Sequence, residues 1–361
     1  MTRLRQNLID LMLIPGLSGH EQRVAAAIRA RLPAQLPTRT DRLGNLIASI
    51  PGDPAAPSVM LFTHMDQLGF FVRKIEPDGL IRVERMGGVS ERALAAQAVL
   101  VCTQDADIPG IIMNKAHHST TPEEKYKVVA TPDLRIDTGH GSKAAVELAG
   151  IRIGTPVVLR PQVVPLAGSR IAGTAVDDRA GCAVLIEIAH ALAAHNPGPT
   201  IHLVWSVQEE FNLRGAVVAG QNLSPDIAIQ IDLMLATDTP DMADRGEMAL
   251  GGGPGISLYS FHGRGTLNGV IPHPALVALF EAAARQSGIP LQRSAQTGVL
   301  TDLSYVQLLG DGVASIDIGF PMRHSHSALE CCDLGDLEAL TALTLHALGA
   351  IGPTFSLSRE P

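Results

Sequence analysis

Strands and helices alternate along the second half of the chain. The predicted strands are TIHLVWSVQ (200–208), DIAIQID (226–232) and VASIDIGF (313–320). The predicted helices that separate or follow them are 179–195, 214–223, 273–288, 302–312 and 333–351. Strands that alternate with helices form a largely parallel sheet with helices on both faces. The sequence therefore predicts an α/β fold with a mixed, mostly parallel sheet flanked by helices.

This pattern begins near the N-terminus and is then interrupted. The runs NLIASI (45–50) and SVMLFTHMD (58–66) are β-rich, whereas residues 68–166 contain many short strands around turns such as Pro77-Asp78-Gly79. Short strands at close spacing are typical of a small barrel or sandwich. We therefore expect a small β-barrel-like domain at 68–166, inserted into an α/β domain made of residues 1–67 and 167–361.

Two helices are expected before the first strand. Residues 3–13 form the first, and Ser18 and Glu21 stand three residues apart just before an apolar run. This spacing is that of a capping box, in which the two side chains satisfy the first N–H groups of a helix. The sequence thus predicts that Ser18 caps the second helix.

Charge and composition exclude several functions. Among 361 residues the formal net charge is -8 and aromatic residues make up 3%, which disfavours binding to nucleic acid or to an anionic membrane. The four cysteines form no C-x-x-C pair, so a cysteine zinc site is not expected. Because no signal peptide and no run of about 20 apolar residues is found, we expect a cytoplasmic protein with free thiols.

Histidine and acidic residues follow the predicted strands. They are His64, Asp66, Glu209, Glu210, Asp232, and either His324 or His326, while Asp177 and Asp178 precede a helix. Each has a simpler explanation, since an aspartate often caps a helix or begins a turn. In α/β sheets, however, ligands bind at the carboxyl ends of the strands. Because buried carboxylates cannot cluster without a neutralising cation, their convergence predicts a metal site.

The kinds of ligand indicate which metals could bind. Imidazole and carboxylate groups without thiolate suit zinc, cobalt or manganese. Two imidazoles with three or four carboxylates make at least five ligands, which exceed the three protein ligands that one catalytic zinc usually takes. Two divalent metal ions per subunit, sharing a bridging carboxylate at about 3.5–4 Å separation, would use all five.

Spacing suggests roles for three carboxylates near these ions. Side chains two apart on a strand face the same side, so Asp66 can accept a hydrogen bond from His64 and orient its ring. Adjacent side chains on an extended segment point apart, so Glu209 and Glu210 should not bind the same ion. One of them would bind metal, and the other, its pKa raised by its neighbour and by burial, would act as general base.

Taken together, the motifs resemble those of the family-42 metallopeptidases, which comprise TET, deblocking and glutamyl aminopeptidases and are also called cellulase M-like. The similar segments are THMDQLGF (63–70), AVDDRAG (175–181), QEEFNLRGA (208–216), Ile231-Asp232, GVLTDLSYVQLLGDGV (298–313) and PMRHSHSALE (321–330). The resemblance extends over nearly the whole chain and implies the zinc-aminopeptidase-like fold.

The resemblance also implies a role for each site residue. Asp177 would bridge both ions, His64 and Asp232 would complete one site, and Glu210 and His326 would complete the other. Glu209 would be the catalytic base, with Asp66 as the partner of His64. His324 stands where the family tends to have an aromatic residue, and His326 is preferred because Ser327 and Glu330 follow it.

The predicted function is a metal-dependent aminopeptidase that removes N-terminal residues from peptide substrates. The inserted domain is implied to mediate subunit contacts in a homo-oligomer, from dimer to dodecamer. The main alternative is a deacylase or deblocking hydrolase of N-acylated amino acids or peptides. A cellulase would not need the histidines, and a non-catalytic protein would not need the complete set of site residues.

Overall fold

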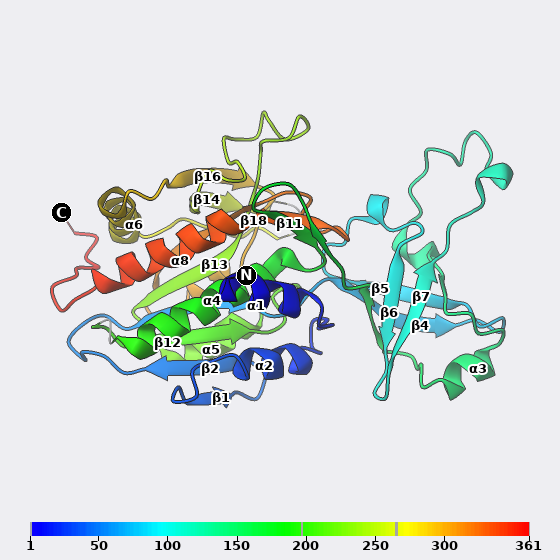
Figure 1. Ribbon diagram of the computed structural model, residues 1–361, viewed down its shortest axis with the longest axis horizontal. Coiled ribbons are helices and arrows are strands. Elements are labelled where there is room, and N and C mark those ends of the chain that lie inside the picture. The colour runs from blue at the N-terminus through cyan, green and yellow to red at the C-terminus, as the bar shows by residue number, and fades with distance from the viewer. Residues whose placement is uncertain (1, 196–197, 264–265, 361) are drawn as a thin grey trace.

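The structure, a computed structural model, describes residues 2–195, 198–263 and 266–360. It consists of an α/β body and a β-barrel that projects to one side of it (Figure 1). The chain enters the barrel after the third strand of the body and returns to the body before its longest helix. The predicted fold class is confirmed.

The body is built on a nine-stranded sheet within the described residues, and neighbouring strands run β1-β2-β12-β3-β13-β17-β14-β15 with β16 beside β14. Their bounds are β1 Thr38–Thr40, β2 Leu46–Ile50, β3 Val59–His64, β12 Ile201–Ser206, β13 Ile227–Leu235, β14 Gly255–Phe261, β15 Gly269–Val270, β16 Gln292–Thr297 and β17 Ala314–Met322. The central strands β12, β3, β13 and β17 are parallel, whereas the other pairings, except that of β14 with β16, are antiparallel. The carboxyl ends of the central strands therefore meet at one edge.

Helices cover both faces of this sheet. One face packs against α1 (Arg3–Met12), α2 (Gln22–Arg29), α4 (Val176–Ala194), α6 (Pro274–Ser287) and α8 (Leu334–Gly349). The other packs against α5 (Gly215–Leu223) and α7 (Leu303–Val306). Because both faces are covered, β3 is buried at every position, His64 included. Apolar packing thus holds the strand that presents His64.

The barrel is a closed sheet of six strands in the order β4-β5-β8-β7-β6-β9. Its elements are β4 Gly69–Ile75, β5 Ile81–Met86, β6 Ala98–Cys102, β7 Asp107–Ile112, β8 Ile136–Asp137, β9 Pro156–Leu159, the helix α3 Lys143–Leu148 and the 3₁₀ turns η1 Glu91–Ala93, η2 His117–Ser119 and η3 Thr131–Asp133. It has an apolar core of its own, around Phe70 and Val83. The short β8 closes it, pairing with Ile81 of β5 and with Ile111 and Ile112 of β7.

A small sheet lies where the barrel returns to the body. It contains β10 (Val163–Pro165), β11 (Arg170–Gly173) and β18 (Glu330–Asp333), all antiparallel. β10 lies within the range predicted for the insert, yet it pairs with β11 of the body. The domain limits 67/68 and 166/167 stay a prediction.

The predicted capping box is wrong. Helix α2 has Glu21 at its N-cap position without a side-chain capping bond. The Ser18 hydroxyl donates instead to Asp66 Oδ2, and the Glu21 carboxylate accepts from the N–H groups of Gly19 and Gln208. Both side chains thus make contacts with the edge of the sheet that carries the candidate site, because the segment before α2 packs there.

Candidate metal centre

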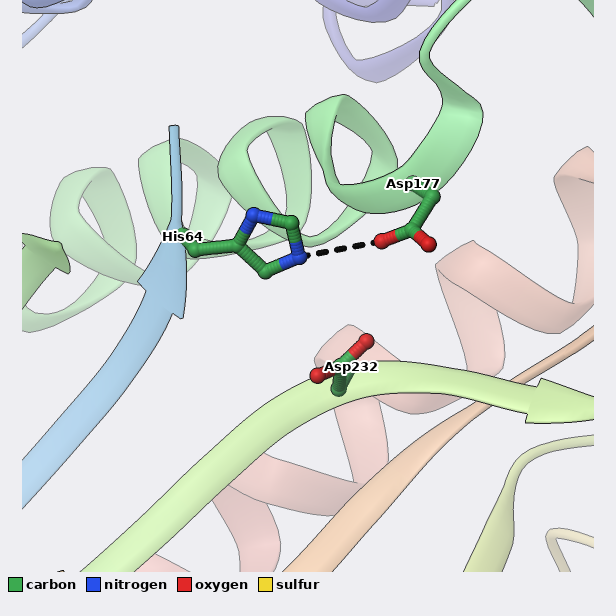
Figure 2. Close-up of side chains that lie close together, drawn as sticks. All are labelled: His64, Asp177 and Asp232. Carbon is green, nitrogen blue, oxygen red and sulfur yellow. Dashed lines mark hydrogen bonds and ion pairs between the residues drawn. The ribbon is translucent and has the colours of Figure 1, made fainter. Parts of the chain in front are cut away.

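Three predicted ligands converge from the end of β3, from β13, which continues three residues past Asp232 to Leu235, and from the start of α4. His64 is the last residue of β3, Asp232 lies on β13 and Asp177 begins α4. Figure 2 shows the Asp232 carboxylate beside the contact between His64 Nε2 and Asp177 Oδ1, which are 2.9 Å apart. One ligand atom from each residue lies within 4.8 Å of the others. This arrangement can hold one metal ion.

A second group shares Asp177 with the first. It contains Glu210 and His326, again with ligand atoms within 4.8 Å of one another. His326 Nε2 lies 3.4 Å from Asp177 Oδ2 and 3.8 Å from Glu210 Oε1. Asp177 therefore turns one carboxylate oxygen toward each group, as a bridging ligand requires.

The structure distinguishes between the members of two residue pairs, Asp177 and Asp178, and His324 and His326. Asp178 is engaged elsewhere, because its carboxylate accepts from the Gly181 N–H at 2.9 Å and from the Thr63 hydroxyl. It thus caps the helix while Asp177 faces the ligands; the peptide bond between them is cis. Within the described part of the chain, His324 belongs to neither ligand group, whereas His326 belongs to one.

The two adjacent glutamates lie in a turn, so the expected extended conformation is wrong. Strand β12 ends at Ser206, and Gln208 has a φ of 58°. Glu210 joins the second ligand group, while Glu209 lines the cavity and belongs to neither group of the described residues. The side chains of Glu209 and Glu210 are therefore separated by the turn and not by the alternation of a strand.

Asp66 holds this turn against β3. Its two carboxylate oxygens accept from the backbone N–H groups of Glu209 and Glu210, each at 3.0 Å. Burial would raise its pKa, but contacts with His64, Ser18 and Glu209 outweigh burial and lower it. His64 Nδ1 lies 3.4 Å from Asp66 Oδ1, longer than a well-formed hydrogen bond. Asp66 thus lies beside His64, but the predicted hydrogen bond from His64 Nδ1 is not formed among the described residues, and the carboxylate positions both glutamates instead.

Glu330 and Gly88 also position ligands, although sequence reasoning assigned them no such role. The buried Glu330 carboxylate accepts from the N–H of Asp177 at 3.0 Å and from the N–H of His326 at 2.7 Å. The Gly88 carbonyl accepts from His326 Nδ1 at 3.0 Å. Because Nδ1 is then the protonated nitrogen, Nε2 is free to bind a metal. In the sequence, the only sign of these positioning contacts was that Glu330 follows His326 by four residues.

The raised pKa values of the clustered acids indicate that the site fits a cation, because burial disfavours their negative charge. Burial raises the pKa of Asp232 to about 7, that of Glu210 to about 8 and that of Glu209 well above its usual range. Burial acts on Asp177 too, but hydrogen bonds from His326 and His64 outweigh it and hold its pKa well below the usual range. Glu210 Oε1 is buried without a hydrogen-bond partner among the described residues. Imidazole and carboxylate donors in this setting fit divalent metal ions.

A cavity of about 470 Å³ opens onto both ligand groups. Besides the ligands, its lining includes Glu209, Leu233, His262 and Val299. The fully buried Asp302 accepts from the Ser206 hydroxyl at 3.2 Å and contributes to the raised pKa of Glu209. This volume is within the range of small-ligand pockets, so the cavity can admit the end of a peptide.

Comparison with known proteins identifies the chain. Residues 44–343 match the family described as M42 glutamyl aminopeptidase. The chain belongs to the M42 family. This M42 protein is 37% identical over 346 residues to SgcX of Escherichia coli (strain K12), with 94% of this chain and 93% of SgcX covered.

Solved structures agree with this assignment. The aminopeptidase APDkam598 from the archaeon Desulfurococcus kamchatkensis superposes with a TM-score of 0.91 at 32% identity, covering 98% of this chain and 96% of its own. The Pyrococcus horikoshii TET1 peptidase, which can assemble into a tetrahedron or a large octahedral shell, has a TM-score of 0.86 at 28% identity, with 96% and 99% covered. The predicted resemblance is confirmed, and the M42 protein is a metal-dependent aminopeptidase, a hydrolase of peptide bonds.

Family membership implies divalent metal ions, and the two ligand groups provide places for them. No helix among the described residues is long and apolar enough to cross a bilayer.

Proposed function

We propose that this M42 protein removes N-terminal residues from peptides with two divalent ions per subunit. Asp177 would bridge them, His64 and Asp232 would hold one, and Glu210 and His326 the other. The observation that carries this proposal is the sharing of Asp177 between two groups of ligand atoms. Bound there, such ions would polarise the scissile carbonyl and make a water more acidic. Zinc, cobalt and manganese all suit the donor set.

Glu209 is the proposed general base. It lines the cavity beside both ligand groups but, within the described residues, is a member of neither. Burial raises its pKa, so its carboxylate can take a proton from the attacking water and give it to the leaving amine. The hydrogen bond from its backbone N–H to Asp66 Oδ1 fixes the position of Glu209 in the turn.

The charge of the cavity favours a free amino end over a blocked one. Asp177, Asp232 and Glu210 would be neutralised by the bound ions, so Glu209 is the carboxylate of this cavity that stays available to a substrate. A peptide's α-ammonium group would gain from Glu209, whereas an N-acyl group carries no charge to interact with it. This supports the aminopeptidase over the deacylase, which would use the same ions and base.

The test is hydrolysis of aminoacyl aryl-amides by protein stripped with a chelator and then titrated with zinc, cobalt or manganese. We expect activity to return and to saturate near two ions per chain, with N-acetylated versions of the same amides cut far more slowly. Faster cleavage of the acetylated amides would instead establish the deacylase. Saturation at one ion would contradict the two-ion proposal.

We also propose that the barrel mediates assembly into a homo-oligomer. Apolar side chains are exposed on the barrel and its loops, among them Ile111, Tyr126, Val128 and Ile153. Exposed apolar surface of this kind marks contact sites, and the similar TET1 peptidase assembles into shells. The mass of the purified protein, measured by light scattering, should be that of several chains; a monomer at micromolar concentration would contradict this. A cytoplasmic location stays a prediction.

A further inference from the structure

A second, smaller cavity of about 30 Å³ adjoins the main one. Leu233, Val299 and Thr301 line both of them, so the small cavity lies directly behind one wall of the site. Its remaining lining is mostly polar and includes Ser260, Gln296 and Asp317. A space of this volume holds one or two waters or the tip of a side chain.

Three buried polar atoms around this cavity have no hydrogen-bond partner among the residues that the structure describes. They are Asp317 Oδ2, Gln296 Oε1 and Ser260 Oγ, on side chains that are 3%, 6% and 5% exposed. The second polar atoms of Asp317 and Gln296 are hydrogen-bonded. Thr301 donates to Asp317 Oδ1 at 3.0 Å, and Gln296 Nε2 donates to the Leu235 carbonyl at 3.4 Å. Buried polar groups are normally paired. Two unpaired acceptors and a hydroxyl therefore call for a ligand that donates hydrogen bonds.

The sheet register places this acceptor cluster close to the ligand Asp232. Strands β13 and β17 are parallel, with Asp232 opposite Gly319 and Gln230 opposite Asp317. Asp317 is two residues from Gly319, so it is on the same face of the sheet as Asp232. Strand dimensions put the two aspartate Cα atoms about 8 Å apart. A side chain that starts beside Asp232 and extends past Leu233 can reach Asp317.

From this arrangement we propose that the small cavity receives the side chain of the substrate's N-terminal residue and selects one that ends in an ammonium group, as lysine does. The inference rests on the proposed function, because it assumes that the main cavity holds the N-terminal residue. The four-carbon stem of lysine would pack against Leu233 and Val299, and its three N–H donors would meet Asp317, Gln296 and Ser260. A glutamyl residue would instead bring a second carboxylate to Asp317.

Equilibrium binding tests the proposal independently of turnover. L-Lysinol and L-norleucinol have side chains with the same four-carbon stem, but only lysinol carries the terminal ammonium, and neither has a bond to cleave. Calorimetric titration of the purified protein should show lysinol binding at least about tenfold more tightly, as expected for a hydrogen-bonded charge. Asp317→Asn should remove most of this difference, whereas the exposed Asp311→Asn should retain it.

Each outcome has a definite meaning. Equal affinities for the two alcohols in the wild-type protein, or no binding of lysinol, would overturn the proposal even if the Asp317 variant did not fold. A preference that survives Asp317→Asn would overturn the role of Asp317. The relative kcat/KM for lysyl, norleucyl and glutamyl aryl-amides should follow the same order. If no aryl-amide is hydrolysed but lysinol is preferred, the proposed function fails while the binding site stands.

Discussion

Glu209→Gln should lower kcat by about 10²–10⁴-fold and leave the metal content and melting temperature near those of the wild type. The amide has nearly the shape of the carboxylate but cannot take a proton from water. Glu209 is no member of either ligand group among the described residues, so ion binding should persist. Its backbone N–H, not its side chain, contacts Asp66, so the turn should also persist. Steady-state kinetics, metal analysis and thermal melting measure these three quantities.

A matched control for this variant is Glu338→Gln. Glu338 is exposed on α8, so the same chemical change there should alter neither kcat nor metal content. In the Glu209 variant, the acidic limb of the pH profile of kcat/KM should also be lost, since that limb reports the free base. Turnover close to the wild-type rate, with intact metal content, would show that another group takes the proton.

Asp177→Asn should remove both ions, because each ligand group includes one of the Asp177 carboxylate oxygens. We expect the affinity for metal to fall by more than about 100-fold at both sites, since loss of even an indirect partner of a ligand costs 10–100-fold. Activity should fall to background and should not return at ordinary metal concentrations. Elemental analysis after dialysis against zinc, together with calorimetric titration, measures the loss.

Asp232→Asn provides the matched comparison, because Asp232 belongs to the first group alone. That variant should retain about one ion per chain, held by the second group. If both variants lose the same single ion, Asp177 does not bridge two sites. Melting temperatures of the metal-free proteins separate metal loss from misfolding, since the Asp177 backbone N–H should still donate to Glu330 in a folded variant.

Residues that follow apolar strand segments were the most predictable part of the site. His64 and Asp232 follow apolar runs whose length and composition indicate buried parallel strands, and such strands end at a common edge. Their convergence could therefore be inferred without any knowledge of distant contacts. The barrel could be expected for a similar reason, since short strands and turns at close spacing fill residues 69–159.

The contacts that position the ligands were not predictable from local pattern. Ser18 and Glu21 have capping-box spacing, but Ser18 contacts a residue 48 positions away and Glu21 one 187 positions away. Glu330 contacts Asp177 across 153 positions. The glutamate turn escaped prediction because the apolar run continues past Ser206, where the strand ends. In each case tertiary packing determined the partner, and local spacing was compatible with another one.

The contact between Gly88 and His326 has a consequence for how this molecule can be divided. Gly88 lies just after barrel strand β5, and its carbonyl orients the His326 ring, while the nearby Ser90 N–H donates to the His326 carbonyl. A shortened chain that joins residue 67 directly to 167 would keep His64, Asp177 and Asp232 but lose these two contacts of His326, leaving the one with Glu330. The ring of His326 is therefore oriented by a residue of the inserted segment, so the second ligand group depends on the barrel as well as on the α/β body.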